Sequence, residues 1–564
     1  MEPQKNKQST NIPPQQSVSF IPLGGEEIVT RNMYLYEYNN QILIVDCGLG
    51  FPDETMLGVD LLIPDISYLL EQLKSGKKRI VGMLLSHGHE DHIGGLPFIL
   101  PQLPKFPIYA SPLTTTLTNE KLAEFQLPRA VQQVSFGASP IRLGDFTVSF
   151  LHVTHSIPDS THMVIKTPVG VLYHGADYKF DLTPANGKRT EYDNIMRAGS
   201  EGVLALISDS LGSARSGHTP SEQFLDDHFE EAMRKASGKL LVTTYSSNIS
   251  RVQQIVNAAE RVGRKVAFVG RSVIKMKEIG QRIGYLQIRP GTEVKAEAVK
   301  NMKPRQVVLV VAGSQGQENS ALTRIAGGDH RDIRLTPGDV VVFSSDTIPG
   351  NELAVQELFT TIAKKGAHVI HSSVAGDFHV SGHGSAEDHK LLMALTNPRF
   401  HIPISGTYQD MVSYRENAMQ MGAKQKDILL LENGQEVILT NNSIRLGKKI
   451  EINNVYVDAV SGEELEHFVI RDREKLAKEG VVVILAEVKG SDGQLAQKPE
   501  IILRGSALTD VDGIIGEIEK TLSQKREKVT NWVHVRKTIS DIVGKHLSKK
   551  FNTRPLILPV VIEV

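Results

Sequence analysis

The chain has 564 residues, and its 63 basic residues almost balance its 64 acidic ones. This length exceeds what one hydrophobic core supports, so we expect two or three domains. The net charge gives no reason to expect an overall affinity for nucleic acid, and the single cysteine, Cys47, excludes an intramolecular disulfide and a cysteine-rich zinc site. A lone cysteine fits a reducing compartment, so a cytoplasmic location is expected.

The order of apolar and polar segments predicts the domain organisation. The N-terminus is polar and has no apolar signal-peptide core, which predicts a disordered tail. Short strand-like runs and amphipathic helices then predict an αβ layered domain, and later βαβ units predict a parallel sheet. No apolar run approaches the roughly 18 residues of a membrane helix, so no membrane partner is expected. The predicted segments are a tail (1–17), a first domain in two parts (18–220 and 374–447), an inserted domain (221–373), a polar linker (448–464) and a small α+β domain (465–564).

The most informative local motif is HGHEDH at residues 87–92, which follows the apolar run GMLLS. Histidine and carboxylate side chains are the ligands that Zn²⁺ and Mn²⁺ prefer. Alternation along a loop would direct His87 and His89 to one side, and Asp91 and His92 to the other. Two divalent ions roughly 3.5 to 4 Å apart could then lower the pKa of a shared water for hydrolysis. A solvated polar loop is the alternative interpretation, and four ligand-type residues within six positions argue against it.

The motif HGHEDHIGG resembles the signature of the metallo-β-lactamase fold. The segments HSIPDS, GADYKFDLTP, GSQGQENSALTRIA and HVSGHG extend the resemblance to bacterial ribonuclease J, over roughly residues 18–564. The resemblance implies an α/β fold, in which a metallo-β-lactamase αββα sandwich is interrupted by a parallel-sheet β-CASP domain. It also implies a small α+β C-terminal domain that is used in oligomerisation.

The resemblance also implies roles for individual residues. One metal would be held by His87, His89 and His155, and a second by Asp91 and His92, with Asp177 bridging the two. Asp46 would orient the ligand loop through hydrogen bonds. The predicted catalytic residues are Asp91, Asp209 and His383. Glycine backbone and serine hydroxyls near His383 would bind the phosphate at the cut, so the predicted substrate-binding residues are His379, Val380, Ser381, Gly382, His383, Ser385 and, at a strand-to-helix junction, Arg271.

One expected metal ligand is missing. The family has a histidine in a segment of the form P-V-H-G-E-Y-R, whereas residues 403–409 read PISGTYQ, with Ser405 at that position. A serine hydroxyl is a poor zinc ligand. His401 is four residues away, or about 13 Å along a strand, and cannot replace it. We therefore expect the second site to be weakened or empty. With Ser250 in SSNISR, where the family usually has histidine, the pattern resembles the less active second paralogue of Firmicutes.

Other basic and aromatic residues are candidates for RNA contacts. Residues 520–554 carry ten lysines or arginines against two acids, together with Trp532. This segment is either an RNA-binding surface or the solvated face of a small oligomerisation domain. Arg251 in the inserted domain is a further candidate for the RNA channel, and Tyr245 could stack on a base.

The predicted function is that of a metal-dependent ribonuclease of RNA maturation and decay. By resemblance, it would degrade single-stranded RNA from a 5′-monophosphate end, as a 5′-to-3′ exonuclease with an additional endonuclease mode. It would contain two Zn or Mn ions and form homodimers or tetramers, hetero-oligomers with a catalytic paralogue and contacts with other RNA-decay enzymes. The alternative is a largely inactive, RNA-binding structural subunit. A small-molecule metallohydrolase is a third option, which the long insertion argues against.

Overall fold

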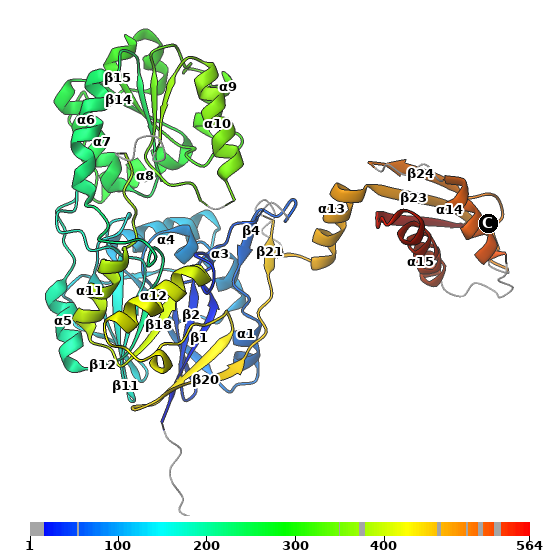
Figure 1. Cartoon of the computed structure of the whole chain (residues 1–564), viewed down its shortest axis with the longest axis horizontal. Coiled ribbons are helices and arrows are strands. Elements are labelled where there is room, and N and C mark those ends of the chain that lie inside the picture. Colours follow the sequence, from blue (N-terminus) through cyan, green and yellow to red (C-terminus); the bar gives the residue numbers. More distant parts are fainter. Residues whose placement is uncertain are drawn as a thin grey trace, which may run out of the picture. The chain divides into compact units, whose positions relative to one another are not determined.

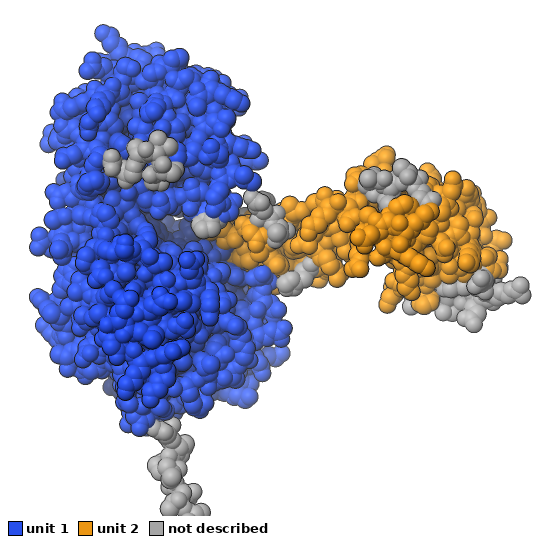
Figure 2. Space-filling view, in the orientation of Figure 1, with its two compact units in different colours: residues 1–50, 63–454 blue, residues 51–62, 455–564 orange. Residues whose placement is uncertain are grey.

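The computed structural model describes residues 16–53, 56–348, 350–371, 378–458, 464–491, 494–505, 511–523 and 532–564. Most of the predicted tail, the predicted boundary between residues 373 and 374, and part of the predicted linker lie outside these ranges. The chain forms two compact units (Figures 1 and 2), of which one comprises residues 1–50 and 63–454 and the other residues 51–62 and 455–564.

Two mixed sheets face each other across a hydrophobic core of the first unit, which contains Phe20, Tyr36, Phe146 and Ile402. One sheet has eight strands, in the order β20-β19-β1-β2-β3-β5-β6-β7, and the other has six, in the order β18-β12-β11-β10-β9-β8. The strands of the first sheet are β1 (Val18–Gly24), β2 (Met33–Tyr38), β3 (Gln41–Val45), β5 (Arg79–Leu85), β6 (Ile108–Ala110), β7 (Gln132–Gln133), β19 (Gln435–Leu439) and β20 (Ile444–Lys449). Those of the second sheet are β8 (Ile141–Leu143), β9 (Phe146–His152), β10 (Thr161–Thr167), β11 (Gly170–Gly175), β12 (Val203–Asp209) and β18 (Phe400–Ile404).

Helices cover the outer faces of the two sheets and produce an αββα sandwich. The outer face of the six-stranded sheet packs against α5, α11 and α12 through Ile195, Leu392 and Tyr414. Strand β2 is buried along its whole length, as expected for a strand covered on both faces. The helices of this domain are α1 (Ser67–Lys74), α2 (Glu90–Ile93), α3 (Leu96–Ile99), α4 (Pro112–Glu124), α5 (Tyr192–Glu201), α11 (Ala386–Thr396) and α12 (Tyr408–Gln420).

The chain leaves this sandwich after β12 and returns to it at β18. These two strands pair in parallel, from Ala205 opposite Phe400 to Asp209 opposite Ile404. Residues that are almost two hundred positions apart therefore end at the same edge of the sheet. The carboxyl ends of parallel strands are where αβ proteins present functional groups.

The insertion contains an all-parallel sheet in the order β14-β15-β13-β16-β17. Helices lie on both sides of it, with α6 and α7 on one side and α9 and α10 on the other (Figure 1). Its strand β15 reads VVLVV and is completely buried, as in other sheets covered on both faces. The elements are β13 (Leu240–Thr243), β14 (Lys265–Val269), β15 (Val307–Val311), β16 (Val340–Phe343), β17 (His368–Ile370), η2 (Glu222–Phe224), α6 (Leu225–Lys235), α7 (Ile249–Val262), α8 (Arg271–Arg282), α9 (Ala321–Gly327) and α10 (Glu352–Lys364).

The second unit has its own core, in which one face of α15 contributes Val535, Ile539, Val543 and Leu547 at helical spacing. Residues 51–62 belong to this unit, whereas the sequence pattern had placed them in the first domain. Its elements include β23 (Val481–Val488), β24 (Glu500–Arg504), β25 (Leu556–Glu563), α13 (His467–Glu479), α14 (Val511–Leu522) and α15 (Trp532–Phe551), and a small sheet of β4 (Leu61–Ile63), β21 (Val455–Val457) and β22 (Glu464–Leu465).

The basic segment of this unit is only partly described. Lys525, Arg526 and Lys528 lie outside the described residues. Trp532 is partly buried and packs against the core of the unit. The lysines and arginines of α15 are exposed. This exposure is compatible both with an RNA-binding surface and with a solvated helix face. Within the described ranges, no helix combines the length and apolar character that crossing a membrane requires.

Candidate metal centre

The motif HGHEDH begins where β5 ends. His87 is fully buried, and His89 has an extended backbone at the start of the short helix α2. Asp91 and His92 lie within α2, so a helical turn, not the expected alternation along a loop, separates the two pairs. The loop that follows β3 packs tightly against this turn, because a Cβ at Gly48 would lie 1.6 Å from the carbonyl oxygen of Asp91.

Four ligand atoms converge at the first predicted metal position. The Nδ1 atom of His89 lies 3.1 Å from Nε2 of His87 and 3.2 Å from Nε2 of His155. Oδ2 of Asp177 lies 3.7 and 3.8 Å from the same two Nε2 atoms. A tetrahedral zinc ion with bonds of about 2.0–2.1 Å separates its ligand atoms by about 3.3 Å, so this geometry fits a metal.

The protonation of these groups also suits a metal. Burial lowers the pKa of His87 and His155 well below the usual value, and lowers that of His89 to about 4, so all three imidazoles are neutral. Burial alone would raise the pKa of the Asp177 carboxyl, but His92 and His383 hold it well below its usual range. Oδ1 of Asp177 is buried without a hydrogen-bond partner among the described residues. Neutral imidazoles around an ionised carboxylate are a suitable ligand set for a divalent cation.

The second predicted position shares Asp177. Nε2 of His92 lies 3.3 Å from Oδ2 of Asp177 and 3.5 Å from Oδ2 of Asp91. Nδ1 of His92 lies 2.8 Å from Oδ2 of Asp46, whose carboxylate also accepts hydrogen bonds from the backbone and hydroxyl of Ser86. Asp46 therefore holds the His92 ring with Nε2 facing the other two ligands.

Ser405 lies beside this second group, immediately after β18, with a φ of 54°. Its hydroxyl donates to Oδ1 of Asn32 at 2.9 Å and lies 3.1 Å from the Tyr34 hydroxyl. Nδ2 of Asn32 in turn lies 3.2 Å from Nε2 of His92. The serine thus takes part in a hydrogen-bonded cluster, and among the described residues three protein ligands converge at the second position. His401 is buried beside Tyr414.

A third group joins the metal ligands to the HVSGHG segment. Nδ1 of His383 lies 2.8 Å from Oδ2 of Asp209, and Nε2 of His383 lies 3.8 Å from Oδ2 of Asp177. The His383 ring also contacts that of His155, with 5.0 Å between centroids. Although burial opposes it, the two carboxylates raise the pKa of His383 to about 9. A protonated imidazole at this place can hold an anionic oxygen or donate a proton.

Arg251 forms hydrogen bonds with the loop that precedes His383. This side chain is fully buried and donates to the carbonyl of Val380 at 3.2 Å and to Nδ1 of His379 at 2.9 Å. It also forms an ion pair with Glu222 at 2.6 Å. The expectation that Arg251 contacts RNA in the channel is wrong, because the guanidinium is buried and occupied by protein groups. The hydroxyl of Tyr245 also forms a hydrogen bond within the protein, because it donates to the Asp346 carbonyl.

Gly382 connects this loop to a metal ligand. Its carbonyl accepts a hydrogen bond from Nδ1 of His155 at 2.7 Å, which leaves Nε2 to face the metal. A Cβ at Gly382 would lie 2.8 Å from the His155 ring, so this close approach requires glycine. Next to it, the hydroxyl of Ser381 accepts a hydrogen bond from Arg215 at 3.1 Å. Arg215 is exposed, and sequence reasoning missed it because no metal-ligand pattern surrounds it.

Two predicted substrate-binding residues lie in other surroundings. Ser385 is buried at the start of α11, where its backbone N–H donates to Asp388 and its hydroxyl lies 3.0 Å from that of Thr219. Arg271 is exposed at the first residue of α8. The structure therefore brings His379, Val380, Ser381, Gly382 and His383 into one loop and gives Ser385 a capping environment.

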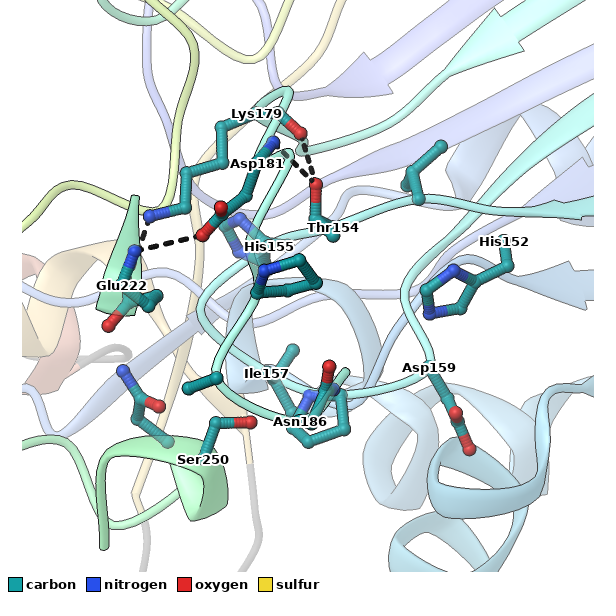
Figure 3. Close-up of a pocket in the computed structure, with 15 residues that line it drawn as sticks. His152, Thr154, His155, Ile157, Asp159, Lys179, Asp181, Asn186, Glu222 and Ser250 are labelled. Atoms are coloured by element: carbon teal, nitrogen blue, oxygen red, sulfur yellow. Dashed lines mark hydrogen bonds and ion pairs between the residues drawn. The ribbon is translucent and has the colours of Figure 1, made fainter. Parts of the chain in front are cut away.

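A small pocket lies beside His155 (Figure 3). Ser250 and Asn186 line it opposite the histidine, and Lys179 reaches Glu222 at 3.0 Å on its other side. Ser250, one of the positions where the chain departs from the expected motif, is thus close to the metal centre.

Comparisons with known proteins agree with this geometry. Residues 28–184 match the metallo-beta-lactamase superfamily, residues 237–362 match the "Ribonuclease J, beta-CASP domain" family and residues 468–564 match the "Ribonuclease J C-terminal domain" family. A crystal structure of a protein of unknown function from Enterococcus faecalis covers 75% of this chain and all of its own chain at 16% identity, with a TM-score of 0.53, which supports the fold alone.

Several relatives match over almost their whole length. Ribonuclease J from Thermus thermophilus is 37% identical, with 98% of this chain and 96% of that protein covered. Ribonuclease J2 from Bacillus subtilis is 33% identical over 97% of this chain and 99% of that protein, and ribonuclease J 1 from Streptococcus pyogenes is 35% identical over 97% of each. The predicted fold is confirmed, and the chain belongs to the ribonuclease J family of metallo-β-lactamase and β-CASP ribonucleases.

Proposed function

We propose that this chain is a metal-dependent 5′-to-3′ exoribonuclease of the cytoplasm, with an additional endonuclease mode. Its substrate is single-stranded RNA with a 5′-monophosphate, and its activity alone is reduced. The observation that carries this proposal is the convergence of His87, His89, His155 and Asp177 beside a second group that, in the described part of the chain, consists of Asp91, His92 and the shared Asp177.

Different residues of the chain would have different roles at the scissile phosphate. Divalent metals held by these ligands would supply Lewis-acid chemistry and activate water. His383, kept protonated by Asp209, faces Asp177 and can bind the phosphate or donate a proton to the leaving oxygen. The Ser381 hydroxyl and the exposed Arg215 guanidinium lie beside it and suit a second phosphate oxygen.

Asp209 should act as a positioning residue for His383. Replacing Asp209 by asparagine removes the carboxylate that orients Nδ1, and we expect the kcat for 5′-monophosphorylated RNA to fall about 10- to 100-fold, with the metal content unchanged. Single-turnover kinetics and elemental analysis of the same preparations measure both. Loss of bound metal, in place of a loss of rate, would contradict this role.

Ser405→His tests the weakened second site. The imidazole adds a fourth protein ligand, so we expect the affinity for the second Mn²⁺ ion to rise more than tenfold. The rate of Mn²⁺-dependent degradation of 5′-monophosphorylated RNA should rise with it. Isothermal titration and decay of a labelled RNA check the two effects.

Ser405→Ala is the matched control, because it removes the hydroxyl without adding a ligand and should leave metal affinity unchanged. If the unaltered chain already binds two ions tightly and matches the rate of a paralogue with histidine at this position, the proposal of reduced activity fails. If Ser405→His binds the second ion but degrades RNA no faster, the chain has a structural role and the missing ligand does not explain its low activity.

The second candidate function is that of an RNA-binding subunit for a catalytic paralogue, in homo- or hetero-oligomers. The observation that favours it is the Ser405 hydroxyl, which is bonded to Asn32 and Tyr34 and not directed at a metal. In a mixed complex with a catalytically inactivated paralogue, this function predicts no RNA decay, whereas the first candidate predicts residual decay.

A further inference from the structure

Helix α4 packs directly against the loop that carries the motif HGHEDH. A Cβ at Gly88, the second residue of the motif, would lie 2.6 Å from Cδ1 of Leu117 in α4. Lys121, one turn further along the helix, pairs at 2.7 Å with Glu90, the fourth residue of the motif. Neither Gly88 nor Glu90 is a predicted ligand, but each stands between two residues that are. Helix α4 therefore contacts the segment whose side chains would hold the metals.

Two acids of the same helix face the inserted domain. Glu120 and Glu124 lie one turn apart on α4, and they pair with Arg282 and Lys275 of α8, respectively. Because the order of the partners is reversed, α8 runs antiparallel to α4 along this contact. Figure 1 shows α8 on the side of the inserted domain that faces α4. We call these four side chains the charged seam.

A hydrogen-bonded cluster continues the contact beyond the end of α8. The Tyr285 hydroxyl donates to the Asp159 carboxylate, and Nζ of Lys188 lies 3.2 Å from Oδ1 of Asp159 and 3.1 Å from the Tyr285 hydroxyl. Oδ2 of Asp159 also accepts the backbone N–H of Leu113, in the first turn of α4, at 3.3 Å. Asp159 is fully buried, whereas the side chains of the charged seam are 27% to 59% exposed. The contact between the two domains thus has a buried end and an exposed end.

Exposed ion pairs contribute little one by one and are screened by salt, so a contact made of them can open. Resting on the proposed metal centre, we propose that the charged seam is a salt-sensitive latch between the inserted domain and α4. When it is closed, the inserted domain holds α4 against the HGHEDH loop and keeps the ligands in place. When it opens, the loop loses this support and the affinity for metal falls. The buried Asp159 cluster is screened less, stays in contact and is the pivot of the movement.

Reversal of the charges on α8 tests the latch. In Lys275→Glu with Arg282→Glu, like charges face α4, so the two helices should separate. Spin labels at Ser200→Cys and Gln356→Cys, on exposed positions of α5 and α10, should report a second population of distances, and the buried Cys47 takes no label. Titration of the full chain with Mn²⁺ should show an affinity about three- to tenfold lower, as expected when two exposed ion pairs are replaced by like charges.

Two controls separate the latch from a general effect of charge. Added negative charge by itself attracts cations. Lys364→Glu with Lys365→Glu, the same change of charge at exposed positions around the end of α10, should therefore leave the Mn²⁺ affinity equal or slightly higher. Glu120→Arg with Glu124→Lys, added to the α8 double variant, forms the ion pairs again with opposite polarity and should restore both measurements.

Salt should change the two proteins in opposite directions. An increase in KCl from about 50 mM to about 500 mM screens an attraction in the unaltered chain, so the second population of distances should grow. In the α8 double variant the same salt screens a repulsion, so that population should shrink. Spectra of the two labelled proteins at both salt concentrations measure this difference in sign.

A single distance distribution shared by the unaltered chain and the α8 double variant would overturn the inference, as would a second population of distances without a loss of Mn²⁺ affinity. These results are distinguishable from a failure of the proposed function. If distances and Mn²⁺ affinity change as described but no RNA is degraded, the nuclease proposal fails and the latch stands. If RNA is degraded and the double variant alters neither measurement, only the latch fails.

Discussion

Replacing Asp177 by asparagine should reduce RNA hydrolysis by more than 100-fold. Asp177 is the one residue that contributes an oxygen to all three groups of convergent side chains in the described part of the chain. Its loss removes the negative charge shared by both metal positions and the acid that faces His383. Because changes behind a metal ligand already cost 10- to 100-fold, removal of a shared ligand should cost more.

The measurement combines decay of 5′-monophosphorylated RNA with elemental analysis of bound Mn and Zn. Both metal positions should lose affinity together, which separates Asp177 from a ligand of one ion only. Asp193→Asn, on the exposed surface of α5, is the control and should behave as the unaltered chain. Retention of both ions and of the rate by Asp177→Asn would refute the assignment of the shared ligand.

Replacing Glu222 by glutamine should destabilise the first unit by about 3 to 5 kcal/mol. Glu222 accepts from Arg251 at 2.6 Å and from Lys179 at 3.0 Å, and all three side chains are buried. Removal of its charge leaves two buried cations that are still hydrogen-bonded but have no opposite charge beside them, and a buried unpaired charge is costly. Because Arg251 also holds the loop of Val380, RNA hydrolysis should fall as well.

The same ion pairs predict a pH dependence. Burial opposes it, but Arg251 and Lys179 lower the pKa of Glu222 to about 2, below the roughly 4.3 of an unfolded chain. The stabilisation is therefore complete above about pH 4.3 and is lost as the pH falls toward 2. Urea unfolding followed by circular dichroism should show a steeper loss of stability between about pH 4.3 and about pH 2 in the unaltered chain than in Glu222→Gln.

Glu230→Gln is the control for this prediction, since Glu230 pairs with Arg234 and Arg261 at the surface of α6. Exposed ion pairs contribute little, so the unfolding curve should not move. Equal stability of Glu222→Gln and the unaltered chain at neutral pH would show that the buried cations find other partners.

Where the chemistry is local, the sequence indicates which side chains converge. The spacing of four ligand-type residues in HGHEDH predicts one cluster, and the family resemblance adds His155 and Asp177. The structure brings these six residues together, with ligand atoms within 4.8 Å in each group. The αββα sandwich and the parallel sheet could also be predicted, because buried strands and crossover helices leave periodic patterns.

Other parts of the site could not be read from local patterns. Asn32 and Tyr34 come from β2 and its preceding loop, and they meet Ser405 only because strands far apart in the chain end at one edge of the sandwich. Arg251 was wrongly expected at the RNA channel, because a helix start looks the same in sequence whether its arginine is exposed or buried.

The hydrogen bond from His155 to the Gly382 carbonyl couples the position of this metal ligand to that of the loop that contains His383. A shift of the imidazole on metal binding must move the loop, and a shift of the loop on RNA binding must move the imidazole. If metal and RNA bind as proposed, thermodynamic linkage requires that RNA changes metal affinity by the same factor by which metal changes RNA affinity. The ion concerned is the first one, which His155 would hold, so RNA would act as an effector of the metal content of that position.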